Sequence, residues 1–91
     1  MKHYYPYAAN DGKHKFYRIT KEDKKVYFGQ ANASDFTIHK DEARRQRYKA
    51  RHKNEDWTKS GIDTAGFWSF RYLWSYPTKQ EAYKHIKAQF L

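Results

Sequence analysis

The stretch that decides the fold is residues 28–57, FGQANASDFTIHKDEARRQRYKARHKNEDW. It leaves a β-branched and aromatic run, crosses a small polar segment at 29–34, and continues with helical spacing. This order predicts a strand, a loop and a helix. The helical half also gathers seven cations, which are Lys40, Arg44, Arg45, Arg47, Lys49, Arg51 and Lys53.

The expected helix has clear start signals but no apolar face. Asp35 or Thr37 can accept the free amides at its N-terminus, and Asp41 in the first turn suits the helix dipole. We expect it to continue to about Asn54. Because one face holds little apolar surface besides Tyr48, the helix must dock through that ring, arginine stems and small alanines.

Upstream of this stretch, the sequence predicts two hairpins. Residues 10–12, Asn-Asp-Gly, favour a tight turn between the aromatic stretch 4–7 and the strand 16–20. A charged loop then joins residues 16–20 to a second run at 25–28. Pro6 lacks an amide hydrogen, so the first stretch lies at a sheet edge or outside the sheet.

Downstream, residues 65–74 fit two templates. A strand would place Trp68, Phe70, Tyr72 and Trp74 on one face; a helix would make a stripe of Phe67, Phe70, Leu73 and Trp74. We favour a helix that ends before Pro77. Thr78 and Glu81 then form a capping box that opens a helix reaching the C-terminus. The expected fold class is α+β: a small antiparallel two- to three-stranded sheet at the N-terminus followed by about three helices.

Composition restricts the classes of protein. With 91 residues the chain is expected to form a single domain, 1–91. Aromatic residues make up 20%, which supports a packed core and argues against disorder. The chain lacks cysteine and any run of 18 apolar residues, so we expect a soluble intracellular protein without disulfides or membrane contact. We expect no cofactor.

The formal net charge of +9 predicts a polyanionic partner. The seven cations of the expected helix are therefore the candidate nucleic-acid-binding residues, with DNA expected rather than RNA. Arginine suits bidentate contact with phosphate or guanine, so Arg44, Arg47 and Arg51 are the preferred phosphate ligands. Lys49 and Lys53 fit a merely solubilising role equally well.

A second candidate site combines Asp35, His39, His52 and Glu55, residue types that hold divalent metals or transfer protons. His39 and His52 would lie about 140 degrees apart on one continuous helix, so a joint site requires His39 in the cap. A structural network of caps and hydrogen bonds is the simpler reading. We therefore assign neither a metal site nor catalytic residues, and we expect a binding protein rather than an enzyme.

The chain resembles a small domain of unknown function found in phages and large DNA viruses. The resemblance covers roughly residues 16–86 and rests on several short motifs: Tyr27-Phe28-Gly29, residues 35–41 (Asp-Phe-Thr-Ile-His-Lys-Asp), Tyr48, Arg51-His52, Glu55, Trp57, Thr64-Ala65-Gly66 and Leu73-Trp74. It implies a viral accessory or virion-associated protein, located in the host cytoplasm or the virion. It implies no particular activity.

The chain is also similar, over fewer residues, to the GIY-YIG nucleases. Residues 16–18 and 27–29 stand where that family carries its two short motifs, and Arg44 or Arg45 where it carries a catalytic arginine. The Gly-Ile-Tyr sequence is missing, and His85 and Ile86 stand near the expected metal-binding glutamate. This similarity implies a degenerate nucleic-acid-binding relative rather than an active enzyme.

Three functions follow as hypotheses. The first is nucleic-acid binding through the arginine-rich helix, with tyrosines stacking on unpaired bases. The second is a phage counter-defence protein that binds a host nucleoprotein, and the third is a metal-dependent nuclease.

Overall fold

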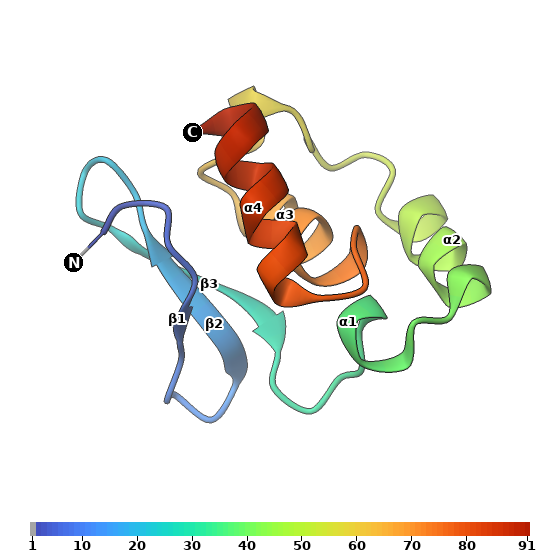
Figure 1. The fold of residues 1–91 in the computed structure, drawn as a ribbon. Helices are drawn as coiled ribbons and strands as arrows, with labels where there is room; N and C mark the ends of the chain where they lie inside the picture. Colours follow the sequence, from blue (N-terminus) through green and yellow to red (C-terminus); the bar gives the residue numbers. More distant parts are fainter. Residues whose placement is uncertain (1) are drawn as a thin grey trace.

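The protein has an α+β fold in which an N-terminal sheet is followed by helices, as the sequence predicts. The computed structural model describes residues 2–91. Strands β1 (Tyr7–Ala8), β2 (His14–Ile19) and β3 (Lys25–Gln30) form one antiparallel sheet in the order β1-β2-β3. In Figure 1 the sheet occupies one end of the molecule and the arginine-rich helix the other. No helix among residues 2–91 is long and apolar enough to cross a membrane.

Both hairpins have the predicted turns. Asp11 accepts hydrogen bonds from the backbone amides of Lys13 (3.0 Å) and His14 (2.9 Å), and Gly12 has a φ of +76°. These contacts close the first turn, because only a residue that tolerates positive φ fits its tip. As Pro6 indicated, β1 is short and lies at the edge of the sheet.

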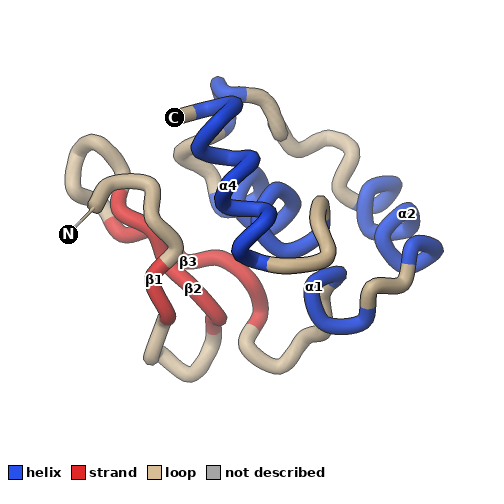
Figure 2. The backbone as a smooth tube through the Cα atoms, in the orientation of Figure 1, coloured by secondary structure: helices blue, strands red, loops and turns tan. Residues whose placement is uncertain are grey.

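The single helix expected from residue 35 to about residue 54 is wrong in its continuity. The chain instead forms α1 (Phe36–His39) and α2 (Glu42–Arg51), which Figure 2 shows as two separate helices. Lys40 ends α1 in the left-handed conformation, with a φ of 53°. Asp41 then caps α2 by accepting hydrogen bonds from the amides of Ala43 (3.0 Å) and Arg44 (3.3 Å). A residue with the extended backbone of an N-cap cannot lie inside a helix, so the chain must break before it.

The helical reading of residues 65–74 is confirmed. Helix α3 (Ala65–Trp68) continues directly into a π-helical segment, η2 (Ser69–Trp74), after the short 3₁₀ turn η1 (Lys59–Gly61). The last helix, α4 (Lys79–Phe90), begins as predicted, because the Thr78 hydroxyl accepts a hydrogen bond from the Glu81 amide at 3.2 Å.

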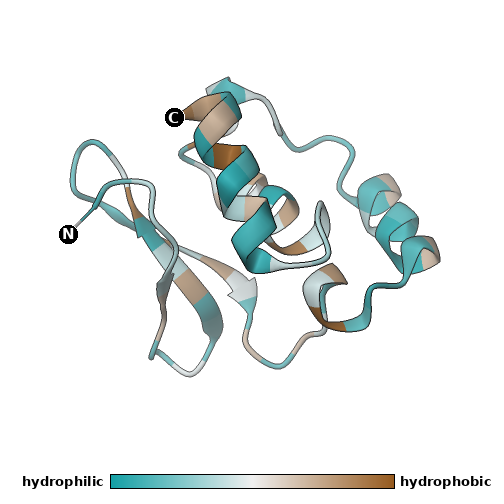
Figure 3. Ribbon diagram, in the orientation of Figure 1, coloured by the Kyte–Doolittle hydropathy of each residue, from teal (hydrophilic) through white to brown (hydrophobic). Residues whose placement is uncertain are grey.

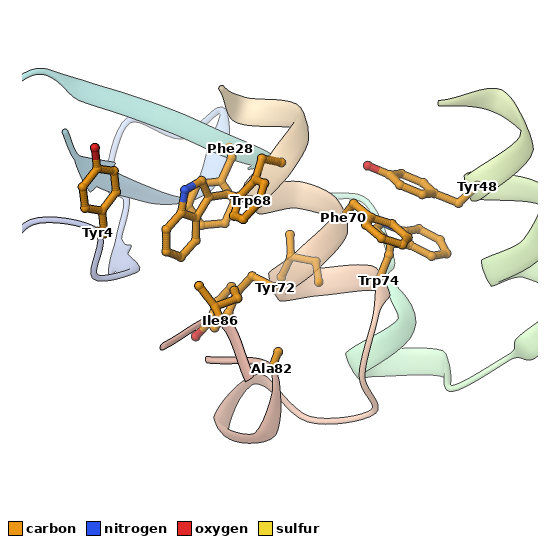
Figure 4. Packing of buried hydrophobic residues seen from close by; sticks show 11 residues of the cluster. Tyr4, Phe28, Tyr48, Trp68, Phe70, Tyr72, Trp74, Ala82 and Ile86 are labelled. Carbon is orange, nitrogen blue, oxygen red and sulfur yellow. The ribbon is translucent and has the colours of Figure 1, made fainter. Parts of the chain in front are cut away.

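The core is built mainly of aromatic rings from β3, α3 and η2, closed by α4. Figure 4 shows Phe28, Trp68 and Tyr72 near Ile86 and Ala82 of α4. By contrast, Figure 3 shows α2 as mostly hydrophilic, and Tyr48 is its buried residue. The core therefore fixes the sheet and the C-terminal helices, while α2 is attached through few side chains.

Arg18 is an unusual member of the interior. Its side chain is fully buried against the Trp68 ring, and its guanidinium donates to the carbonyls of Ile62 (3.1 Å) and Val26 (3.4 Å). Within residues 2–91 its Nη2 atom finds no acceptor. Burial lowers the pKa of Arg18 to about 10, which means that its positive charge opposes folding at neutral pH.

We expect Arg18→Met to leave stability unchanged or to raise it, whereas Arg18→Ala lowers it. Methionine fills much of the same space without a charge, and the Ile62 carbonyl keeps a second donor in the Trp68 ring nitrogen at 2.8 Å. Alanine leaves a cavity and should cost about 2–4 kcal/mol. Urea denaturation followed by circular dichroism gives the order. Equal losses in the two variants would show that the charge itself stabilises the fold.

Candidate nucleic-acid interface

A pocket of about 570 Å³ lies between α2 and the end of β3. One wall is the pocket-facing side of α2, the other is β3 with the loop that follows it, and the floor comes from η2. Its main lining residues are Lys15, Gly29, Ser34, Asp35, Arg44, Arg47, Tyr48, Arg51, His52, Leu73 and Trp74. We call it the arginine pocket.

Three arginines on α2 give this pocket its charge. Arg44, Arg47 and Arg51 are exposed and share one side of the helix, since they follow one another at spacings of three and four residues. Among residues 2–91, no ion pair involves any of the three. Three like charges without an internal counter-ion destabilise the helix slightly and leave their donors free for an external anion.

Stacked rings hold α2 in place beside the pocket. Tyr48 stacks on Trp74 with ring centroids 4.3 Å apart and planes within 10°, and His52 stacks on the other side of the stack at 4.2 Å from Tyr48. Figure 4 shows Tyr48 reaching from α2 toward Trp74 and Phe70. Burial raises the pKa of Tyr48 well above its ordinary value, so this ring stays neutral. The His52 side chain is 37% exposed and forms the open end of the stack.

The base of the pocket is an ion pair that already satisfies itself. Lys15 of β2 reaches the buried carboxylate of Asp35 at 2.5 Å, and the same carboxylate caps α1 by accepting a hydrogen bond from the Thr37 amide at 2.9 Å. The capping role predicted for Asp35 is thus confirmed. Because these two charges cancel, the net charge of the pocket comes from the α2 arginines.

Close packing brings the two walls together at a glycine. Gly29 has a φ of +76°, and a Cβ atom there would come within 2.8 Å of the Leu73 side chain. The neighbouring residues Lys15 and Phe16 both face the helices, Lys15 toward Asp35 and Phe16 toward Tyr72. The usual alternation of a strand therefore fails here, which directs Lys15 into the pocket.

The four other predicted phosphate-binding cations do not line the arginine pocket. Arg45 is used internally: it donates to the Trp74 carbonyl at 2.9 Å and pairs with Glu42 at 2.9 Å. Lys40 donates to the Thr37 carbonyl at 3.0 Å, next to the break between the helices. Lys49 and Lys53 lie elsewhere on α2 and beyond its end.

The second candidate set is dispersed over three arrangements. Asp35 pairs with Lys15, and His52 pairs with Glu55 at 3.1 Å. His39 accepts a hydrogen bond from the Asp41 amide at 2.9 Å, and desolvation followed by the nearby Arg44 charge lowers its pKa. No group of three or more His, Cys, Asp or Glu side chains in the described part of the chain is placed to hold a metal ion. This matches the reading of the four residues as structural.

A second aromatic surface lies on the sheet. Tyr7, Tyr17 and Tyr27 stand opposite one another on β1, β2 and β3, with neighbouring ring centroids 5.7 and 5.5 Å apart. The ammonium group of Lys25 lies 4.9 Å from the centre of the Tyr17 ring. All three rings are half-buried. We call this set the tyrosine row.

Sequence reasoning did not find Lys15 or Trp74 as pocket residues. Lys15 belongs to a strand whose alternation pointed it elsewhere, and Trp74 was assigned to the core. The only local signal is Gly29, since a glycine within a strand often marks a close approach or an irregular backbone.

The fold and the pocket together define a small, basic α+β domain that presents arginines from a short helix beside a stack of rings. The chain belongs to a family of unknown function, DUF5754, whose model matches residues 7–52. That region runs from β1 to the residue after α2, so it contains both walls of the arginine pocket but not its floor. No curated protein and no solved structure is significantly similar to the chain.

Proposed function

We propose that this protein binds nucleic acid through the arginine pocket and the adjoining face of α2. The observation that carries the proposal is the set of Arg44, Arg47 and Arg51, which share one side of a helix, line a pocket and pair with no carboxylate in residues 2–91. Arginine offers bidentate hydrogen bonds to phosphate, and phosphate contacts dominate the affinity of proteins for nucleic acid.

The role of the partners follows from the same chemistry. The net charge of +9 would attract the polyanion, and the exposed end of the ring stack at His52 would offer a face to an unpaired base. DNA is the expected ligand rather than RNA. We further propose that the protein acts as a viral accessory protein, in the host cytoplasm or the virion, as the resemblance to viral domains implies.

Salt dependence of binding tests this proposal. The affinity for a short duplex and for the corresponding single strands, as DNA and as RNA, should fall steeply with salt. In the triple variant Arg44→Gln, Arg47→Gln, Arg51→Gln, the slope of log affinity against log salt should shrink by about 2–3 units, since each lost phosphate contact contributes roughly 0.7–0.9.

The matched control is Lys49→Gln with Lys53→Gln, which removes charge from the same region but not from the pocket. It should lose clearly less affinity than the triple variant. Fluorescence anisotropy at several salt concentrations measures all variants. An affinity that hardly changes with salt, or equal losses in the triple variant and the control, would refute binding through the pocket.

The tyrosine row favours a second candidate function, inhibition of a host nucleoprotein by direct contact. Three neighbouring rings on a sheet face offer the kind of aromatic surface that protein interfaces use. In that case a host protein should remain bound after nuclease treatment and be lost with Tyr17→Ser. Retention that depends on Arg47 and disappears with nuclease would favour nucleic-acid binding instead.

A further inference from the structure

We propose that the arginine pocket receives a terminal phosphate of a nucleotide, a phosphomonoester, rather than the internal phosphates of a continuous strand. This inference rests on the proposed function and names the chemical group that the pocket selects. Such a group occurs at the end of a nucleic-acid strand and on a free nucleotide.

The shape of the site is the first argument. A volume of about 570 Å³ falls within the usual range for pockets that hold small molecules. The site has three sides, formed by α2, by the β3 end with its loop, and by η2. A passing backbone needs an open groove with two exits, whereas a recess with a floor suits the end of a chain or a single nucleotide.

Charge is the second argument. The Lys15–Asp35 pair cancels, so the three α2 arginines face the recess without an anionic partner among the described residues. Arg47 lies between the other two, one turn from each, and can approach an anion at the centre of the site. A phosphomonoester carries about 1.5–2 negative charges at neutral pH and three strong acceptor oxygens, so it matches three guanidinium groups better than a singly charged diester.

The ring stack is the third argument. Trp74, Tyr48 and His52 stack in sequence, and the His52 ring ends the stack with part of its surface exposed beside the arginines. A base can stack on that open ring while its phosphate meets Arg47 or a neighbour. His52 is held in orientation by its hydrogen-bonded contact with Glu55 at 3.1 Å. The site thus joins an anion subsite to a base subsite.

The test uses one fluorescent single-stranded oligonucleotide in three forms: with a 5′ phosphate, with a 3′ phosphate, and with hydroxyl groups at both ends. At fixed ionic strength we expect one phosphorylated form to bind about tenfold more tightly than the form without a terminal phosphate. Arg47→Gln should abolish this preference. Lys53→Gln, which changes a cation outside the pocket, should preserve it.

Competition separates the two sources of the phosphate. A nucleoside monophosphate that displaces the labelled strand at lower concentration than inorganic phosphate supports a nucleotide site with base stacking. If only phosphorylated strands bind, the ligand is a strand end; if the monophosphate alone binds, it is a free nucleotide and the proposed function fails while this inference stands.

Equal affinity for all three oligonucleotides overturns the inference. If that common affinity still falls in the triple arginine variant, nucleic-acid binding by α2 stands and the pocket contacts internal phosphates. If neither the strands nor the monophosphate bind, both the inference and the proposed function are wrong.

Discussion

Trp68→Ala should leave the protein largely unfolded at ambient temperature. Trp68 is fully buried at the start of the helical segment, where it contacts Phe28 of the sheet and the Arg18 guanidinium and donates to the Ile62 carbonyl at 2.8 Å. Replacing a buried tryptophan with alanine typically costs about 3–5 kcal/mol. A 91-residue domain has a total stability of roughly 5–14 kcal/mol, so most of the margin would be lost.

The control for this prediction is Trp68→Phe. Phenylalanine keeps an aromatic ring in the core, and the Ile62 carbonyl keeps the Arg18 Nε donor at 3.1 Å. We expect it to lose less than half as much stability as the alanine variant. Chemical denaturation followed by far-ultraviolet circular dichroism compares the two. Identical denaturation midpoints would show that the ring is not what joins the sheet to the helices.

The second large effect is expected from Tyr48→Ala, and it should be local. Tyr48 is the buried residue of α2, and its ring stacks on Trp74 and His52. Without it, α2 keeps the Arg45 hydrogen bond to the Trp74 carbonyl but loses its main apolar contact. Truncating a buried aromatic ring costs about 3–5 kcal/mol when the whole fold depends on it. Here much of that loss should appear as detachment of α2.

Hydrogen exchange resolved by residue measures this detachment. Amides of α2 (Glu42–Arg51) should lose protection in Tyr48→Ala, while those of α4 (Lys79–Phe90) keep most of theirs. Tyr48→Phe retains the stacked ring and should protect α2 almost as the native protein does. Nucleic-acid affinity should fall together with the protection of α2. Uniform loss of protection over both helices would mean that α2 is integral to the core.

Local signals predicted much of the fold. The Asn-Asp-Gly turn, the extended aromatic runs and the Thr78 cap are decided within a few residues, and each has the structure that its residues favour. The break at Lys40 was missed because either of two aspartates can cap a helix, and both do so here. Periodicity alone cannot show that a chain starts a second helix.

The candidate site was predictable only in part. Arg44, Arg47 and Arg51 were preferred because arginine suits phosphate, and the structure places all three at one pocket. Arg45, their neighbour, could not be separated from them by sequence, because its use depends on a distant backbone carbonyl at Trp74. Lys15 enters through an irregularity of the sheet, which depends on how closely Gly29 approaches Leu73.

The division of the arginine pocket between two parts of the chain has a consequence for dissection of the protein. A fragment limited to residues 7–52, the region that defines the family, would contain the cations but leave Tyr48 without Trp74 to rest on. Such a peptide would carry the charge without the shape. Any minimal recombinant version should therefore extend through Trp74, and a shorter relative would need to obtain an equivalent floor from another chain.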